Sequence, residues 1–250
     1  MIRVDRLWRH RGQLAAPAAN ARARWTAREA LIVELVDGDG LRGQGEAAPL
    51  EGYSPDSLDQ VERALGPLIG ARLDETLPDG FPASARCALE TARLDLAARA
   101  RRQSLPQLLG VPPGTRVAVC ASVDPGSLEQ QLAQAGRAWS RGIRALKVKI
   151  GPRAAWSHEL ALLAELRRRF GKALSLRLDA NGTIDAGELP AVAAELERFE
   201  IDLLEEPVSG GAWSQVEPVR VPLGADESLQ RLDPAVVDAF RRGVLTVAIL

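Results

Sequence analysis

Two lysines and three acidic residues in the second half of the chain have the types and the spacing of a catalytic site. Residues 145–150 have the sequence ALKVKI, and the two-residue period of a strand places Lys147 and Lys149 on one face. The next three apolar segments end in acidic residues, which are Asp179, Glu205 and Asp226. Because ammonium groups on a buried face are costly unless anions lie near them, the pattern predicts that these lysines and carboxylates meet.

Such a group of side chains has a definite chemistry. Three carboxylates that converge on one point repel one another unless a cation binds between them. Oxygen ligands without histidine or cysteine favour Mg²⁺. A lysine in a cleft of low dielectric, beside a second ammonium, is suited to act as a general base. We therefore expect Mg²⁺ with Lys149 as the base, an apparatus that removes a proton next to a carboxylate.

Each of these residues also has an ordinary structural explanation. A single aspartate at the end of a strand is more often a helix cap or a loop residue. Lys147 alone can extend to solvent, and Glu205 with Glu206 can lie in a solvated loop. Their occurrence at the same end of consecutive strands favours a site. The arginine run at 167–169 is expected to be a solvated helix face.

A regular alternation of strands and helices is expected to position these residues. From residue 117 onward, apolar segments predict strands at 117–121, 145–150, 174–179, 201–205, 221–226 and 244–250. Helices are expected at 128–140, 156–170, 186–199 and 234–241. This order predicts an α/β fold with a parallel sheet of the (β/α) barrel type, in which chemistry lies at the carboxyl ends of the strands.

The predicted barrel is incomplete. Eight strand–helix units need about 200–250 residues, whereas the segment from residue 117 to residue 250 holds about six strands. The last expected strand also runs to the final residue of the sequence. We therefore expect a barrel that is truncated relative to the complete fold.

The first part of the chain has a different pattern, which predicts a small α+β unit. Strands are expected at 2–7, 30–36 and 41–47, with the turn sequence DGDG between the last two. Helices are expected to start near residue 57 and to cover 81–100, and loops are expected at 13–28 and 47–55. The expected domains are residues 1–85, an α+β domain, and residues 86–250, the truncated barrel.

Composition indicates the broad class of the protein. A net charge of −1 over 250 residues gives no indication of a nucleic-acid partner. No run of about 18 or more apolar residues occurs, so no membrane span is expected. Cys87 and Cys120 are expected to be reduced thiols packed in the core, which is typical of a cytoplasmic protein. The expected partner is a small-molecule carboxylate substrate. The sequence does not decide whether the protein also forms a homo-oligomer.

Four motifs carry a resemblance to a known family. KVK, LDAN, EEP and ADES occur in this order at residues 147–149, 178–181, 205–207 and 225–228. The chain thereby resembles the enolase superfamily, muconate-lactonizing-enzyme subgroup, which uses a lysine or histidine base with Mg²⁺. Its first unit resembles the capping domain of that family, whose two loops close over the barrel mouth. GEAAPL and GYSP, within 45–55, most resemble the o-succinylbenzoate synthase family, which dehydrates a cyclohexadiene carboxylate in menaquinone biosynthesis.

Carried over to this chain, the resemblance implies a Mg²⁺-dependent lyase. Lys149 would take the proton and return it to the leaving hydroxyl, and Lys147 would tune Lys149 and touch the substrate carboxylate. The metal ligands would be Asp179, Glu205 and Asp226. Weaker candidates are Asn181, Arg177 and Ser228, which would either contact the substrate or support the metal ligands. Tyr53 is a further candidate for substrate contact, with packing of its loop as the alternative. Glu206 would support the site without binding the metal.

The sequence departs from the family pattern at its end. The family has a further lysine after its sixth strand, which here would follow Leu250. We therefore expect these 250 residues, expressed alone, to be inactive and to fold poorly. Two alternatives stay open beside the lyase. One is another enzyme of the superfamily, namely an N-acylamino acid racemase, a dipeptide epimerase or a muconate cycloisomerase. The other is a non-catalytic fragment or pseudoenzyme.

Overall fold

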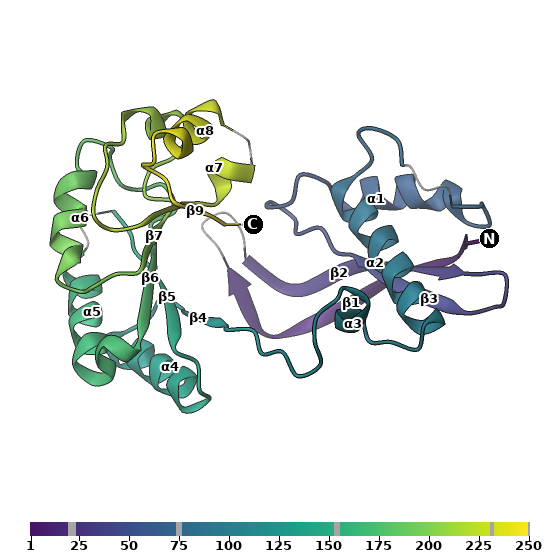
Figure 1. Ribbon diagram of the computed structural model, residues 1–250, viewed down its shortest axis with the longest axis horizontal. Coiled ribbons are helices and arrows are strands. Elements are labelled where there is room, and N and C mark those ends of the chain that lie inside the picture. Colours follow the sequence, from purple (N-terminus) through teal and green to yellow (C-terminus); the bar gives the residue numbers. More distant parts are fainter. Residues whose placement is uncertain (20–23, 74–76, 153–155, 231–232, 250) are drawn as a thin grey trace. The chain divides into compact units, whose positions relative to one another are not determined.

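The chain forms two units, each built on its own sheet (Figure 1). The computed structural model describes residues 1–19, 24–73, 77–152, 156–230 and 233–249. The units are Met1–Arg116, here unit 1, and Val117–Leu250, here unit 2. The boundary expected after residue 85 lies inside helix α2 (Ala83–Ala100), whereas the chain divides after Arg116. The difference arises because α2 buries its apolar side chains in the core of unit 1.

Unit 1 is a three-stranded antiparallel sheet with helix α2 across one face. The strands are β1 (Arg3–Ala19), β2 (Arg24–Val36) and β3 (Arg42–Ala47), in the order β1-β2-β3. The other helices are α1 (Leu58–Leu65), the 3-10 turn η1 (Gly66–Leu68) and α3 (Leu105–Leu108). Ser57 caps α1 in a reciprocal pair with Gln60, near the helix start that the sequence predicts. This is the α+β unit that the sequence predicts.

The prediction of a loop at residues 13–28 is wrong for the part that the structure describes. Strands β1 and β2 continue into this region, and their register pairs Gln13 with Ala27. Residues 20–23 lie outside the described residues. The alanine-rich sequence lacks the alternation of a half-buried strand, but pairing of backbone groups does not depend on that alternation.

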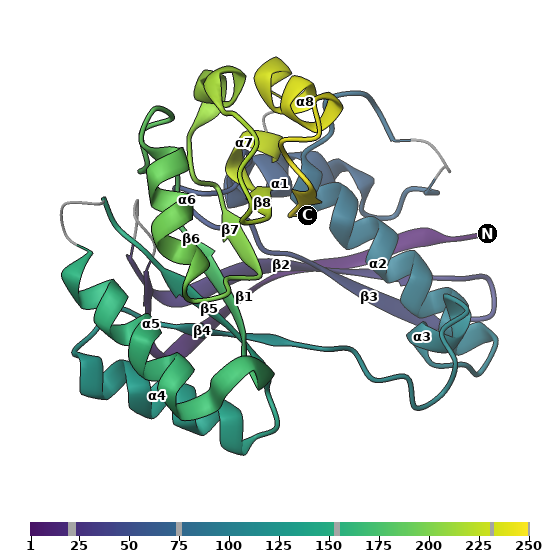
Figure 2. The same cartoon turned by 60° about the vertical axis from the view of Figure 1, so that its left-hand side comes forward.

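Two glycines of β3 allow α2 to lie close to the sheet. A Cβ atom at Gly45 would lie 1.9 Å from the carbonyl oxygen of Ala88, and one at Gly43 would lie 2.4 Å from that of Ala92. Figures 1 and 2 show α2 running across β2 and β3. The backbones of strand and helix are therefore in direct contact, which any side chain at these positions would prevent.

The opposite face of the same sheet buries a carboxylate. Glu34 of β2 accepts hydrogen bonds from Arg6 Nη2 at 2.9 Å, from Gln44 Nε2 at 2.8 Å and from the guanidinium of Arg42. Burial raises the pKa of Glu34, but these donors outweigh burial and hold the pKa below the ordinary value of 4.5. The folded state therefore favours the charged form of Glu34.

Unit 2 is a parallel sheet whose strands are in chain order, as in a barrel. The strands are β4 (Cys120–Val123), β5 (Ala145–Lys149), β6 (Ser175–Asp179), β7 (Leu203–Glu205), β8 (Leu223–Ala225) and β9 (Val247–Ala248). The longer helices are α4 (Leu128–Ser140), α5 (Ser157–Phe170), α6 (Leu189–Glu197) and α8 (Pro234–Arg241). The short ones are η3 (Gly171–Ala173), η4 (Gly210–Gln215) and α7 (Glu227–Gln230). This topology is the incomplete (β/α) barrel that the sequence predicts.

The first and last strands of this sheet are shorter than expected. Strand β4 begins at Cys120, where pairing with Ala145 begins, so the expected start at residue 117 lies outside the paired segment. Strand β9 covers only part of the expected strand at 244–250. Leu250 lies outside the described residues. Among the described residues, none belongs to a helix long and apolar enough to span a membrane.

Helices α4, α5 and α6 cover the outer face of the sheet (Figure 2). Arg167 of α5 connects this helix to the segments that follow α6 and precede β6. Its guanidinium donates to the carbonyl oxygens of Phe199 at 2.7 Å and Leu174 at 2.5 Å. The prediction of a solvated face at 167–169 is therefore wrong for Arg167. Arg168 and Arg169 are exposed and pair with Glu165, as a solvated face would.

Gly45→Ala is expected to lower the free energy of unfolding of unit 1 by about 3 kcal/mol, because strand and helix must separate to admit the methyl group. Gly38→Ala is the matched control, since a Cβ atom there meets nothing within 4 Å. Its effect should stay within about 0.5 kcal/mol. Urea denaturation followed by circular dichroism measures both variants, and equal effects would contradict the close packing of α2 on β3.

Unit 1 is also expected to lose stability as the pH falls below 4.5, the ordinary pKa of Glu34. A carboxylate whose pKa is lowered by folding contributes stability above its unfolded pKa and loses it as the pH falls through its folded pKa. Glu34→Gln should therefore flatten the dependence of the urea midpoint on pH in this acidic range. Asp39→Asn, at an exposed turn position, is the control and should leave the slope unchanged. If the urea midpoint of Glu34→Gln depended on pH as strongly as that of the unaltered protein, Glu34 would not be the source of the acid sensitivity.

Candidate active site

The inner face of the parallel sheet carries the predicted site residues in rows. The register pairs Lys149 with Asp179 and Asp179 with Glu205, so these side chains form one row at the carboxyl ends of β5, β6 and β7. In the row before it, Lys147 pairs with Arg177. The register therefore brings Lys147, Lys149, Asp179 and Glu205 together at one edge of the sheet, and Asp226 directly follows β8.

The ammonium of Lys147 lies between two buried carboxylates. Its Nζ is 2.9 Å from Asp179 Oδ2 and 2.7 Å from Glu205 Oε1. Burial lowers the pKa of Lys147, but the hydrogen bonds to Glu205 and Asp179 outweigh burial and hold the pKa above its ordinary value. Lys147 therefore stays positively charged, and its side chain reaches from its own row to the row of Asp179 and Glu205.

Glu205 feels the charge of both other predicted metal ligands. Its pKa is raised chiefly by burial, and the carboxylates of Asp179 and Asp226 add to the increase, against the opposing effect of Lys147. Asp226 therefore lies near enough to repel Glu205. No three histidine, cysteine, aspartate or glutamate side chains in the described ranges have the arrangement of a formed metal site.

Asn181 fixes the carboxylate of Asp179. Its backbone N–H donates to Asp179 Oδ1 at 3.1 Å, and its side-chain Nδ2 donates to the same oxygen. Asn181 adopts a positive φ of 47°, which lets both donors face Asp179. Both oxygens of Asp179 are thus engaged, Oδ1 by Asn181 and Oδ2 by Lys147. Support of a predicted metal ligand is one of the two roles that the sequence allows for Asn181, and its substrate contact stays a prediction.

Glu206 positions the segment that carries Asp226. Its buried carboxylate accepts from the backbone N–H of Asp226 at 2.8 Å, from that of Ser228 at 3.1 Å and from the Ser228 hydroxyl. The pKa of Glu206 is raised, mainly by burial. The Ser228 hydroxyl is also buried and accepts from the N–H of Gly210 at 3.1 Å. Ser228 therefore donates to Glu206, which agrees with the supporting role that the sequence allows for it, and its substrate contact stays a prediction.

Three further side chains lie on the inner face. Lys149 is exposed at the end of β5, and no described residue forms a hydrogen bond or ion pair with its ammonium. Arg177 is exposed on β6. Cys120 is also exposed, so its predicted burial in the core is wrong, as it is for Cys87. Partial loss of hydration raises the pKa of the Cys120 thiol, and Arg177 and Lys147 oppose the increase, which places the thiol near both cations.

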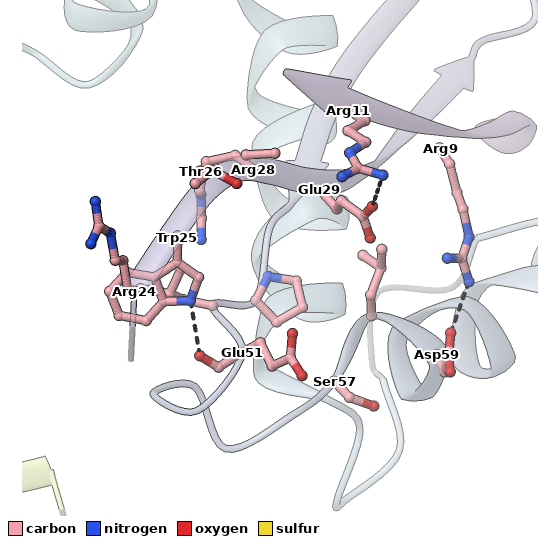
Figure 3. A pocket seen from close by; sticks show the side chains of 14 residues that line it. Arg9, Arg11, Arg24, Trp25, Thr26, Arg28, Glu29, Glu51, Ser57 and Asp59 are labelled. Atoms are coloured by element: carbon pink, nitrogen blue, oxygen red, sulfur yellow. Dashed lines mark hydrogen bonds and ion pairs between the residues drawn. The ribbon is translucent and has the colours of Figure 1, made fainter. Parts of the chain in front are cut away.

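Unit 1 contains a pocket of about 470 Å³ beside β2 and the loop at 47–55 (Figure 3). Four arginines line it, and they are Arg9, Arg11, Arg24 and Arg28. Two of them pair with acids in the lining, Arg9 with Asp59 at 2.8 Å and Arg11 with Glu29 at 3.5 Å. Within the part of the chain described, no carboxylate pairs with Arg24 or Arg28. The pocket therefore has surplus positive charge. Tyr53, on the same loop, is 40% exposed, and its substrate contact stays a prediction.

The donors at the edge of the parallel sheet fit a divalent cation that prefers oxygen. Asp179 and Glu205 already share one cationic group, and Asp226 acts on Glu205 from the next strand end. Carboxylate oxygens of this kind are the ligands that Mg²⁺ prefers. The edge thus offers an anionic cluster beside two lysines, an arrangement that can hold a cation and move a proton.

Comparison with known proteins agrees with this description. Residues 130–248 match the family model described as Enolase C-terminal domain-like. The chain is 30% identical to L-Ala-D/L-Glu epimerase from Bacillus subtilis, over 80% of this chain and 60% of the epimerase. It is 29% identical to o-succinylbenzoate synthase from Thermosynechococcus vestitus, over 89% of this chain and 68% of the synthase. The matched regions thus span between 60% and 68% of the lengths of these two relatives.

Solved structures give the same result. The structure of a substrate-liganded complex of the L-Ala-D/L-Glu epimerase from Bacillus subtilis superimposes with a TM-score of 0.76 and 26% identity. The match covers 98% of this chain and 74% of the epimerase chain. The likeness therefore covers both units of the chain and is not limited to the parallel sheet.

Glu206→Gln is expected to lower the free energy of unfolding of unit 2 by about 1–3 kcal/mol, because the amide presents N–H groups to donors that need an acceptor. Glu227→Gln is the matched control, one residue beyond Asp226 and only partly buried, and should stay within about 0.5 kcal/mol. Chemical denaturation measures both variants. A Glu206→Gln protein as stable as Glu227→Gln would show that Glu206 does not hold the segment.

Proposed function

Because the chain belongs to the enolase superfamily, in the muconate-lactonizing-enzyme subgroup, we propose that it removes a proton next to a substrate carboxylate. The observation that carries this proposal is the Lys147 ammonium between Asp179 and Glu205, with the exposed Lys149 in the same row as the carboxylates. A cation site and an accessible lysine lie side by side, and these are the two elements that such a reaction needs. The substrate is a small carboxylate.

The two lysines have different tasks in this proposal. Lys149 is accessible at the end of β5 and takes the proton from the substrate carbon. Lys147 is a permanent positive charge and holds the substrate carboxylate. Both ammonium groups lie on the inner face, so the acidic carbon and its carboxylate are held on the same side of the sheet.

The acidic residues are the proposed metal ligands. Asp179, Glu205 and Asp226 would hold Mg²⁺, which when bound neutralises the negative charge that develops on the substrate carboxylate. Asn181 keeps Asp179 in position, and Glu206 keeps the Asp226 segment in position. The ligands are thus fixed by neighbours that do not themselves bind the metal.

We propose dehydration of a cyclohexadiene carboxylate, the reaction of o-succinylbenzoate synthases, as the specific activity. The motifs at 45–55 and the synthase relative at 29% identity support it. The base removes the proton next to the carboxylate, and the same lysine then donates it to the hydroxyl, which leaves as water when the C–O bond breaks. One acid–base group on one face is sufficient for this reaction, and Lys149 supplies it.

A dipeptide epimerase is the second candidate, because the epimerase from Bacillus subtilis is as similar to the chain as the synthase is. Epimerisation removes a proton from one face of the α-carbon and returns a proton to the other face. It therefore needs acid–base groups on both faces of the substrate. The two candidates share their first step and differ in their products.

The test and the variants below use the full-length protein that contains these residues. Proton NMR in D₂O with Mg²⁺ compares two substrates, the cyclohexadiene carboxylate of o-succinylbenzoate synthases and the dipeptide L-Ala-L-Glu. Dehydration yields an aromatic product from the first. Epimerisation yields both diastereomers of the second, with deuterium at the α-carbon. Failure to exchange the acidic proton of either compound would contradict the proposed proton abstraction.

Lys149→Ala is expected to lower turnover at least about 100-fold, because it removes the base, while Mg²⁺ binding measured by calorimetry is retained. Lys172→Ala is the control, an exposed lysine of unit 2 that pairs with Glu200, and should retain full turnover. Turnover in Lys149→Ala at the level of Lys172→Ala would exclude Lys149 as the base.

A further inference from the structure

We propose that Lys147 is an exchangeable internal cation of the site, so that a divalent cation binds Asp179 and Glu205 by displacing the Lys147 ammonium from them. This inference rests on the proposed function, because it concerns the same acidic residues. It adds a step that the proposed function does not contain, a competition between two cations for the same oxygen atoms. The displaced ammonium then becomes available to the substrate.

The carboxylate oxygens that would bind the metal are the ones that Lys147 already contacts. Asp179 Oδ1 accepts both donors of Asn181, and Asp179 Oδ2 accepts from Lys147. Glu205 Oε1 also lies against Lys147. A metal ion that binds both carboxylates therefore meets an Asp179 oxygen already bonded to Asn181 or Lys147, and it brings further positive charge close to the Lys147 ammonium. Lys147 is the partner that both carboxylates share, so it is the one that a bridging cation replaces.

Two positive charges at the same oxygens repel strongly in this environment. The side chains of Asp179 and Glu205 are only 7% and 4% exposed, so little water screens them. Without any cation, these buried carboxylates would repel each other and lose their hydration. A cation at these oxygens therefore stabilises the pair of carboxylates, and a second cation at the same oxygens is repelled by the first. This repulsion favours exchange of the Lys147 ammonium for the divalent cation.

Lys147 has the freedom to leave that Asn181 lacks. Its ammonium ends a flexible four-carbon stem, and its side chain is 26% exposed, more than that of either carboxylate partner. Asn181 is held by its own backbone, which also donates to Asp179. The Lys147 side chain starts on the inner face, on the same side of β5 as Lys149. An ammonium that leaves the carboxylates therefore stays on the face where the substrate carboxylate is proposed to bind.

This exchange couples metal binding to substrate binding. If the metal releases Lys147 and the released ammonium binds an anion, each ligand favours the other, because thermodynamic coupling is reciprocal. Lys147 would then lower the intrinsic affinity of the site for Mg²⁺ when no anion is present. The substrate carboxylate would restore that affinity by giving Lys147 a new partner.

The experiment measures Mg²⁺ binding by isothermal titration calorimetry, with Mg²⁺ as the only ligand. Lys147→Met and Lys147→Gln remove the competing charge, and Lys149→Met is the matched control that removes a charge from the same strand and face. The dissociation constant for Mg²⁺ should fall at least about tenfold in both Lys147 variants, as loss of a close competing charge requires. It should change by no more than about threefold in Lys149→Met, because Lys149 shares no oxygen with the carboxylates.

The outcomes separate this inference from the proposed function. Affinities in the Lys147 variants that equal or fall below that of the unaltered protein overturn the exchange and leave the metal site intact. Equal gains in Lys149→Met and Lys147→Met also overturn it, since they reflect net charge alone. If no protein binds Mg²⁺, both the proposed function and the exchange fail.

A folding readout covers variants that lose stability. Far-UV circular dichroism and thermal unfolding are recorded with and without Mg²⁺ for each protein. A Lys147 variant that is less stable without Mg²⁺ and gains more stability from saturating Mg²⁺ than the unaltered protein supports the exchange. Lys147 variants that remain unfolded at saturating Mg²⁺ overturn it, because an exchangeable cation is one that Mg²⁺ can replace.

Discussion

The burial of like charges at one edge of the parallel sheet is the constraint on which the site depends. Asp179 and Glu205 end neighbouring strands, and each has less than a tenth of its side chain exposed. Carboxylates in this position lose hydration and repel each other, so they remain charged and adjacent only with a cation between them. The ammonium of Lys147 fills that requirement. Asn181 and Glu206 satisfy the hydrogen bonds of the carboxylates and backbone groups around it, as burial of polar groups demands.

The backbone around the site is strained at the residues that hold it. Asn181 and Glu206 have positive φ angles of 47° and 40°, a conformation that is uncommon for residues other than glycine. Such residues cost about 1–3 kcal/mol each and persist only where surrounding contacts determine them. Here the contacts are the side-chain bonds to Asp179 and to the Asp226 segment, together with the bond from Gly182 N–H to the Glu206 carbonyl at 2.6 Å. The strain thus lies where the carboxylates are fixed, and the same bonds compensate for it.

Much of this arrangement can be predicted from the sequence, because period and order alone determine it. The alternation around Lys147 gives its face, and consecutive parallel strands bring their carboxyl ends to one edge, so the grouping of lysines and carboxylates follows. What cannot be predicted depends on partners that leave no local pattern. The Ser228 hydroxyl meets Glu206, 22 residues before it, and Arg167 meets backbone carbonyls that any residue would present. The pairing of Gln13 with Ala27 likewise uses backbone groups, and the division after Arg116 follows from the packing of a whole helix.

The charges of the site differ in mobility, and this difference bears on the chemistry. The carboxylates are short, buried and bound by neighbours, whereas Lys147 and Lys149 end long stems and are more exposed. Metal ligands must be fixed in place, and groups that accept a proton or follow a substrate must be able to move. The strand ends therefore supply the fixed anions, and a single strand, β5, supplies both mobile cations from one side. In the proposed function these residues determine the first step, removal of the proton, but not the product. Dehydration sends the proton to the hydroxyl that leaves as water, whereas epimerisation returns a proton to the opposite face of the carbon, so the product depends on a leaving group in the substrate and on an acid that faces Lys149 across it.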